Sequence, residues 1–580
     1  MKQSEKSVPA HLQQYVCEQH YDQYSPIDHA VWRYVMRQNH HFLKDVAHPA
    51  YVEGLLSSGI NIEAIPRVEE MNACLARSGW GAATIDGLIP GVAFFDFQGH
   101  GILPIATDIR RVEHIEYTPA PDIIHEAAGH APILFDAKYA EYVKLFGKIG
   151  AKAFATKEEH EAFEAVRHLT IVMEDRNSTE EEIAEAKRLV EEKQTAITDI
   201  SEAEQISRLF WWTVEYGLIG DVNNPKIYGA GLLSSVGESK QCLTDSVKKI
   251  PFSIEACINT PYDVTTMQPQ LFVCQSFDEL IESIEKFADT LAVRTGGTAG
   301  LNKAVRSQNT ATAVFNSGIQ VTGIIHELLN DENGEAIYIK TAGPTALSIN
   351  GKELVGHSKA VHADGFGTPV GLLQGDISLE ECSDELLEAL GIVVGKQVCL
   401  PFKSGVKVNG IVKHIVKHEN KVALISFTDC NVSLQDIVLF ESSWGTYDMT
   451  VGSSIISVFA GAADPQSYFQ PVEMLENKTS SQRTLSQLEQ LYLHVRALRE
   501  QKEWNENSAT LVASILDTLR VSHKTEWLLR LEILELFHMY NVETTETHKL
   551  QEELLELAKH EKVRNLIQNG LQLLPLAQEL

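Results

Sequence analysis

The chain has 580 residues, of which 44% are hydrophobic and 22% are charged, a composition typical of globular proteins and unlike that of disordered or fibrous ones. Its formal net charge of −30 at pH 7 argues against nucleic acid and anionic membrane surfaces as partners, because proteins bind both mainly through Lys and Arg. At roughly 150 residues per domain, the length predicts several domains.

The sequence carries no signal for secretion or membrane insertion. Residues 1–14 lack the apolar core of a secretory signal, and no apolar run approaches the ~20 residues of a spanning helix. The eight cysteines are scattered without a CxxC pair, which is typical of reduced thiols in a protein core. We therefore expect a cytoplasmic protein.

The first hundred residues predict helices at the start of the first domain. Residues 8–59 carry apolar side chains at mixed helical spacing, and a further helix is predicted after Pro66. Residues 87–107, GLIPGVAFFDFQGHGILPIAT, are punctuated by Gly and Pro and predict strand and turn. This segment leads to Arg110.

The stretch from Pro121 to His130, PDIIHEAAGH, offers two candidate metal ligands, His125 and His130. Five residues separate the pair by about 140° on an ideal α-helix, which is unfavourable for chelation. One histidine must therefore lie where the helix ends or loosens, and Gly129 permits such an exit. Taken alone, the motif also fits ordinary core or surface histidines.

Glu215 lies within ISRLFWWTVEYGLIG, a nearly continuous apolar run. A buried carboxylate costs several kcal/mol unless it is paired or coordinates a cation. An Arg or Lys partner would satisfy it, but two histidines elsewhere in the chain favour a metal. Two imidazoles and one carboxylate suit Fe(II) and leave coordination positions open for oxygen or a substrate, so the sequence predicts a mononuclear iron oxygenase.

Four segments in series carry a family resemblance: Arg110, YTPAPDIIHEAAGH, FWWTVEYGL and YGAGLLSSVGE. In this order and at this spacing, the chain resembles the pterin-dependent aromatic amino acid hydroxylases over roughly residues 10–300. The resemblance implies a mainly α catalytic domain that holds Fe(II) through His125, His130 and Glu215 and uses a tetrahydropterin. It also implies small-molecule partners: an aromatic amino acid, the pterin and O2.

The same resemblance implies roles for further residues. Arg110 would bind the substrate carboxylate as a bidentate fork, which suits a guanidinium better than an ammonium. The resemblance assigns cofactor contacts to Glu126 and Phe210. Leu88 stands at the position of the family's pterin-stacking Phe, and Phe94 or Phe95 would take over that role. The remaining residues that the resemblance places at the amino-acid pocket are Tyr117, Thr118, Trp211, Gly231, Ser234 and Val273.

Two positions bear on which aromatic ring is oxidised. Val273 stands where tyrosine-preferring members carry an acidic residue, and Trp211 stands where tryptophan-preferring members tend to carry Phe. The resemblance therefore implies hydroxylation of L-phenylalanine to L-tyrosine. Three alternatives remain: tryptophan or mixed specificity, a non-catalytic sensor of aromatic amino acids, and a zinc peptidase. The five-residue spacing of the histidines argues against the zinc peptidase.

The second half of the chain predicts two accessory regions, giving a multidomain protein with divisions at 1–300, 301–475 and 476–580. A boundary rich in Gly, Thr, Asn and Ser at 294–318 precedes β-branched segments that predict a small barrel or sandwich. Residues 476–580 predict a helical bundle, with a homo-oligomer interface as the alternative use of its apolar stripes. The β-rich histidines are predicted to be surface or turn residues: His357, His362, His414 and His418.

Overall fold

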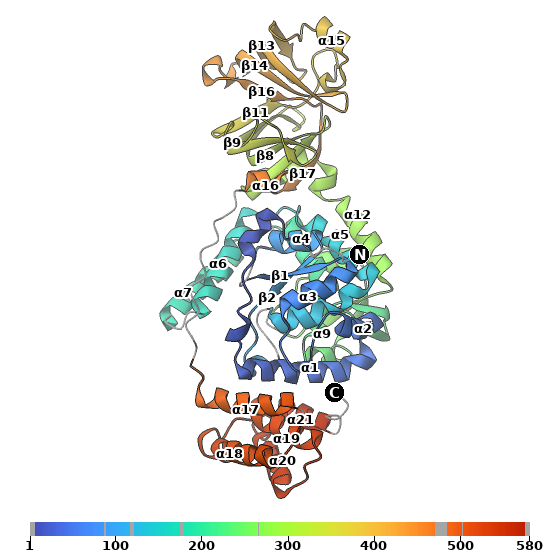
Figure 1. The fold of residues 1–580 in the computed structure, drawn as a ribbon. Helices are drawn as coiled ribbons and strands as arrows, with labels where there is room; N and C mark the ends of the chain where they lie inside the picture. Colours follow the sequence, from blue (N-terminus) through green and yellow to red (C-terminus); the bar gives the residue numbers. More distant parts are fainter. Residues whose placement is uncertain are drawn as a thin grey trace.

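The computed structural model describes residues 6–85, 89–116, 121–174, 179–264, 266–469, 484–501 and 503–574. They form an elongated molecule in which a helix-rich first half lies between a β-rich region at one end and the carboxy-terminal helices at the other (Figure 1). Among the described residues, no helix is both long and apolar enough to cross a membrane.

The first half is built around the long helix α1 (Pro26–Val46), whose side chains enter the main apolar core. Ser25 and Asp28 start this helix as a capping box, because each side chain accepts the backbone N–H of the other residue. Further helices of this half are α2 (Pro49–Ser57), α3 (Val68–Leu75), α5 (Ala137–Gly150), α6 (Lys157–Glu174), α7 (Glu180–Thr195), α8 (Glu202–Phe210), α9 (Ala230–Leu233), α10 (Glu238–Gln241), α11 (Ile254–Asn259) and α12 (Phe277–Ala288).

The prediction of strand and turn over residues 87–107 is wrong for its middle part, which forms helix α4 (Gly91–Gly99). The aromatic run had indicated a strand, but tertiary packing overrides that local preference. Ala93 and Phe97, one turn apart, are buried in one apolar cluster, and Phe95 enters the main core. Within the described part of the segment, the strand is β2 (Ile102–Ala106), at its end.

Two small sheets complete the first half. Strand β1 (Gly81–Ile85) pairs in parallel with β2, and a four-stranded sheet has the order β4-β3-β6-β5. Its strands are β3 (Leu218–Asp221), β4 (Asn224–Ile227), β5 (Lys248–Pro251) and β6 (Gln270–Cys274). Because β3 begins three residues after Glu215, its parallel pairing of Leu218 with Val273 fixes the chain just beyond that carboxylate.

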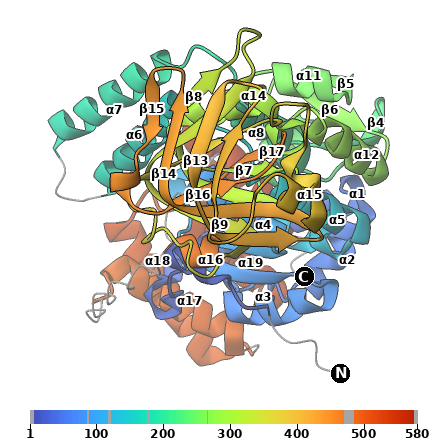
Figure 2. The same cartoon turned by 90° about the horizontal axis from the view of Figure 1, so that it is seen from above.

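The β-rich region contains two antiparallel sheets, each with its own apolar core, and Figure 2 shows them overlying the first half. The first has the order β10-β9-β8-β7-β17 with β11 beside β9, and the second has the order β12-β13-β14-β15 with β16 beside β14. Their bounds are β7 (Thr310–Phe315), β8 (Ile319–Asn330), β9 (Ala336–Ile349), β10 (Lys352–Glu353), β11 (Gly365–Pro369), β12 (Gln397–Pro401), β13 (Val406–His418), β14 (Lys421–Leu434), β15 (Ile437–Phe440), β16 (Tyr447–Thr450) and β17 (Ile455–Ala460).

The predicted boundary segment, residues 294–318, contains regular structure. It begins in helix α13 (Ala292–Thr295) and continues through helix α14 (Gly297–Ser307) into β7. Its small residues allow close packing: a Cβ added to Gly300 would lie 3.1 Å from the Val458 side chain on β17. Two short helices, α15 (Asp384–Ala389) and α16 (Pro465–Tyr468), complete the β-rich region.

The carboxy-terminal helices pack directly on α1. They are α17 (Gln487–Gln501), α18 (Glu506–Ser522), α19 (Leu528–Met539), α20 (Thr545–Leu557) and α21 (Glu561–Leu573). Arg33 Nε lies 2.6 Å from Glu532 Oε1, and the Tyr34 hydroxyl donates to the backbone carbonyl of Leu566 at 2.7 Å. Apolar side chains of α1 and α19 also belong to one core cluster, so the helices share a core with the first half.

Candidate metal centre and substrate site

His125 and His130 lie on a π-helix, η5 (Ile124–His130). A π-helix carries i→i+5 backbone hydrogen bonds, so residues five apart lie on the same face, which an α-helix does not allow. Gly129 is required at this point because an added Cβ would lie 2.6 Å from the carbonyl oxygen of Ala230 on α9. The loosened helix expected from the histidine spacing is therefore a complete π-turn.

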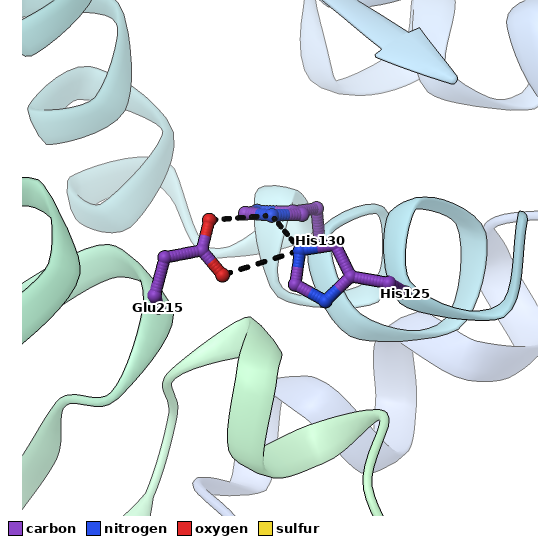
Figure 3. Close-up of side chains that lie close together, drawn as sticks. All are labelled: His125, His130 and Glu215. Carbon is purple, nitrogen blue, oxygen red and sulfur yellow. Dashed lines mark hydrogen bonds and ion pairs between the residues drawn. The ribbon is translucent and has the colours of Figure 1, made fainter. Parts of the chain in front are cut away.

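Glu215 also ends a π-helix, η7 (Trp211–Glu215), and its carboxylate faces both imidazoles (Figure 3). Its Oε2 lies 3.2 Å from His125 Nε2, and its Oε1 lies 3.1 Å from His130 Nε2. The two Nε2 atoms are 3.2 Å apart. Among the described residues, the ion pairs of Glu215 are with these two histidines, and no Arg or Lys takes the role of partner.

This geometry fits a bound metal ion. Ligand atoms bound at roughly 2.1 Å and at right angles are separated by roughly 3 Å, close to the three distances of this cluster. The set of two histidines and one carboxylate leaves positions open, as in mononuclear Fe(II) oxygenases. Burial alone would raise the pKa of Glu215, but the imidazoles outweigh it and hold the pKa well below its ordinary value.

Ser234 is placed to orient the first ligand. Its hydroxyl lies 3.1 Å from His125 Nδ1, the ring nitrogen that points away from Glu215. It also donates to the backbone carbonyl of Ala230 at 2.8 Å. Such an outer contact fixes the orientation of an imidazole ring. Ser234, which the resemblance places at the amino-acid pocket, therefore contacts His125 of the candidate metal centre.

Arg110 is bound bidentately by Asp122. The guanidinium donates from Nε to Oδ2 and from Nη2 to Oδ1, both at 2.8 Å. Asp122 Oδ1 also accepts the backbone N–H of His125 at 3.0 Å, as a cap would. Asp122 therefore connects the predicted substrate arginine to the histidine helix, and only the folded structure could show the connection.

Trp211, which begins the π-helix that ends at Glu215, lies in an aromatic stack. Its ring stacks on Tyr216 at 4.5 Å and on Tyr262 at 4.4 Å between centroids. Gly231 is needed beneath this stack, because an added Cβ would lie 2.9 Å from the Tyr216 ring. Tyr262 had no distinguishing sequence signal, since it lies in a polar loop far from the motifs.

On the predicted pterin side, Glu126 is buried, and its Oε2 has no hydrogen-bond partner among the described residues. This oxygen lies 3.9 Å from His130 Nε2. Burial raises the pKa of Glu126 to about 8, although His130 opposes the shift. A ligand that forms a hydrogen bond with this oxygen would satisfy it, because an unpaired buried polar atom is costly.

The other predicted residues lie as follows. Phe210 is buried and contacts the rings of Phe94, Phe95 and Phe146, so these aromatic side chains form one cluster. Val273 is buried on β6. Tyr117, Thr118 and Leu88 lie outside the described residues.

The similarity to known proteins covers the same part of the chain. Residues 13–175 and 178–296 match the model of the biopterin-dependent aromatic amino acid hydroxylases. The phenylalanine-4-hydroxylase of Chromobacterium violaceum is 28% identical over 264 residues, which cover 45% of this chain and 74% of that protein. The Pseudomonas aeruginosa enzyme of the same name is 29% identical over 274 residues, covering 46% and 87%.

Solved structures of the Chromobacterium violaceum enzyme are similar to the same half. One with iron and phenylalanine bound is 27% identical, covers 47% of this chain and 83% of that chain, and has a TM-score of 0.36. Residues 13–175 and 178–296 therefore form a domain of the biopterin-dependent aromatic amino acid hydroxylase family, and this domain is a pterin-dependent aromatic amino acid monooxygenase.

Proposed function

We propose that the protein hydroxylates L-phenylalanine to L-tyrosine using Fe(II), a tetrahydropterin and O2. The observation that carries the proposal is the convergence of His125 Nε2, His130 Nε2 and both Glu215 oxygens within 3.1–3.2 Å. Fe(II) held there would supply the activation of O2, with the pterin as the co-reductant. The protein contributes binding, orientation and the exclusion of water.

Arg110 is the proposed anchor of the substrate carboxylate. Its side chain is buried and is held by Asp122 on one edge and by the Ser234 carbonyl at 3.3 Å from Nη1. A guanidinium carries more N–H donors than these bonds use, so it can also bind a carboxylate. Asp122 would fix the anchor relative to the histidines, which matters because small displacements of substrate are costly in rate.

The pterin is proposed to lie on the side of Glu126. The unpaired Oε2 of this residue supports a ligand that forms a hydrogen bond with it. Phe94, Phe95 and Phe210, which the family resemblance assigns to the pterin, would supply aromatic contacts. Trp211 Nε1, also buried and without a hydrogen-bond partner among the described residues, is a second polar atom available to an organic ligand.

Phenylalanine is proposed as the substrate on two grounds. The relatives reported above are named phenylalanine-4-hydroxylases. Val273 is an apolar residue at the position where tyrosine-preferring members carry an acid, and its side chain is buried. We further propose that residues 1–300 form the catalytic unit and that 301–475 and 476–580 form accessory units.

The test of substrate choice is a parallel assay of the iron-loaded protein with L-phenylalanine, L-tryptophan and L-tyrosine, each with tetrahydropterin and O2. We expect tyrosine formation from phenylalanine to be the fastest reaction and to match pterin oxidation. Faster hydroxylation of tryptophan would overturn the phenylalanine assignment. Binding of phenylalanine without any hydroxylated product would favour a sensor.

A further inference from the structure

A second cluster of two histidines and one carboxylate lies in the β-rich region, far along the chain from the hydroxylase site. One ligand atom each from His357, His362 and Asp448 lies within 4.8 Å of the other two. The sequence had predicted surface or turn histidines here, because Asp448 is distant in the chain from both. In the structure the three side chains are only 13%, 10% and 6% exposed.

The backbone holds both histidines in place against β9. His357 and His362 lie on the loop between β10 and β11. The carbonyl of His357 accepts the N–H of Leu347 at 2.9 Å, and the carbonyl of His362 accepts the N–H of Thr345 at 3.0 Å. The loop is therefore bound to the sheet at each histidine, which restricts the positions that the two rings can take.

The carboxylate is oriented from the second sheet. Asp448 on β16 pairs in register with Ser426 on β14, and the Ser426 hydroxyl donates to Asp448 Oδ1. The other oxygen, Oδ2, faces both histidines. A hydrogen bond from a neighbouring side chain is the usual way in which a protein orients a ligating carboxylate.

The facing atoms are close but are not hydrogen-bonded to one another. Asp448 Oδ2 lies 3.6 Å from His357 Nδ1 and 3.7 Å from His362 Nε2. Both nitrogens are buried and have no hydrogen-bond partner in the described part of the chain. Leaving a buried polar atom unpaired is costly, and a cation between the three atoms would satisfy all of them at once.

We propose that His357, His362 and Asp448 form a second metal site, which binds a divalent transition-metal ion, with Zn²⁺ as the expected occupant. Imidazole nitrogens favour such ions over Mg²⁺ and Ca²⁺, which prefer oxygen ligands. Tetrahedral bonds of about 2.1 Å separate ligand atoms by about 3.4 Å, closer to the 3.6 and 3.7 Å found here than octahedral spacing is. Three protein ligands leave the fourth position for water or a ligand.

The competing explanation is a charge cluster in which a protonated imidazole shares Asp448 without any metal. The two explanations differ in metal retention, so the test begins from the full-length Glu215→Ala protein, in which the hydroxylase triad lacks its carboxylate. The protein is stripped with a chelator, incubated with Zn²⁺ and desalted before metal analysis. We expect about one equivalent of Zn²⁺ to be retained per chain.

Added to this background, Asp448→Asn or His357→Ala with His362→Ala should abolish retention, while His326→Ala, at an exposed histidine of β8, should preserve it. Titration with Co²⁺ should give the intense visible bands of tetrahedral coordination, and these should be lost with Asp448→Asn. Zn²⁺ should also raise the Tm of the Glu215→Ala protein, but not the Tm of the variants that additionally lack ligands of the second site. If Asp448→Asn does not fold, His362→Gln takes its place.

No retained metal in the Glu215→Ala parent, or retention unchanged by the ligand substitutions, would overturn the second site. This outcome is independent of phenylalanine hydroxylation, because none of the three ligands lies in the hydroxylase triad.

Discussion

Asp122 shows how one buried carboxylate can serve both the substrate anchor and the metal helix. It accepts two hydrogen bonds from one edge of the Arg110 guanidinium, and it also accepts the backbone N–H of His125. The Arg110 guanidinium holds the pKa of Asp122 below its ordinary value despite complete burial, so the pair is ionic. A buried ion pair of this kind fixes geometry more than it adds stability.

Asp122→Asn should therefore weaken substrate binding while leaving the metal ligands in place. Losing one charged hydrogen bond costs about 1.5–3 kcal/mol, so we expect the KM for phenylalanine to rise roughly 10- to 100-fold. Steady-state kinetics and iron content check this. Asp136→Asn, at the N-cap of α5, is the matched control. An unchanged KM in Asp122→Asn would contradict the positioning role.

Glu238 gives the protein a pH-dependent stability. It accepts the Tyr216 hydroxyl at 3.0 Å and the backbone N–H of Gln268 at 3.2 Å. Burial raises its pKa from 4.5 to about 7, so the folded state binds this proton more tightly than the unfolded state. The resulting stabilisation is fully present below pH 4.5 and is lost as the pH rises through 7.

Glu238→Gln cannot ionise and should remove this part of the pH dependence. Between pH 4.5 and 8, we expect the variant to lose less unfolding free energy than the wild type, by up to about 3 kcal/mol. Urea unfolding at a series of pH values measures the difference. Glu255→Gln, which changes an exposed carboxylate, serves as the control. Parallel pH profiles for wild type and Glu238→Gln would show that Glu238 does not titrate in this range.

At the level of elements, both parts of the candidate triad are presented by π-helices, η5 and η7. Local signals predicted part of the surroundings, because the apolar run around Glu215 indicated the burial of this carboxylate. Helix α4 was not predicted, because its aromatic residues favour strands until tertiary packing decides. The Arg110–Asp122 pair depends on how the loop between them folds, and the cluster of His357, His362 and Asp448 depends on a contact between distant segments. Spacing along the sequence encodes neither.

Gly129→Ala tests whether close packing of η5 on α9 maintains the histidine face. The added Cβ would lie 2.6 Å from the Ala230 carbonyl oxygen, so one element must move. We expect a stability loss of about 1–3 kcal/mol, together with weaker iron retention. Thermal unfolding and metal analysis measure the two effects. Gly91→Ala on α4, where an added Cβ meets nothing within 4 Å, is the control.

At the level of the whole molecule, a buried charge network joins the carboxy-terminal helices to the catalytic half. Glu535 on α19 lies 2.5 Å from Arg37 of α1 and 2.8 Å from Arg499 of α17. Glu63, in the loop before α3, contacts the same two arginines. Because both arginines are almost fully buried, removal of an acidic partner leaves uncompensated charge in the interface.

Glu535→Ala should therefore destabilise the protein by about 3–5 kcal/mol and affect the catalytic half as well as the carboxy-terminal helices. Denaturant unfolding followed by both tryptophan fluorescence and hydroxylase activity tests the coupling. Glu500→Ala removes an exposed acid on α17 and should change neither signal. Loss of the carboxy-terminal helices without loss of catalytic stability would contradict a shared core.

Measuring iron content together with product formation tests whether His125, His130 and Glu215 hold the iron of a hydroxylase. Anaerobic reconstitution with Fe(II) in an Asp448→Asn background excludes metal at the second site. Tetrahydropterin, O2 and L-phenylalanine are then added while tyrosine and oxidised pterin are followed. We predict about one iron per chain and tyrosine formed in step with pterin oxidation, with both lost in Glu215→Gln and retained in Glu255→Gln. Full iron content and tyrosine formation in Glu215→Gln would contradict the account.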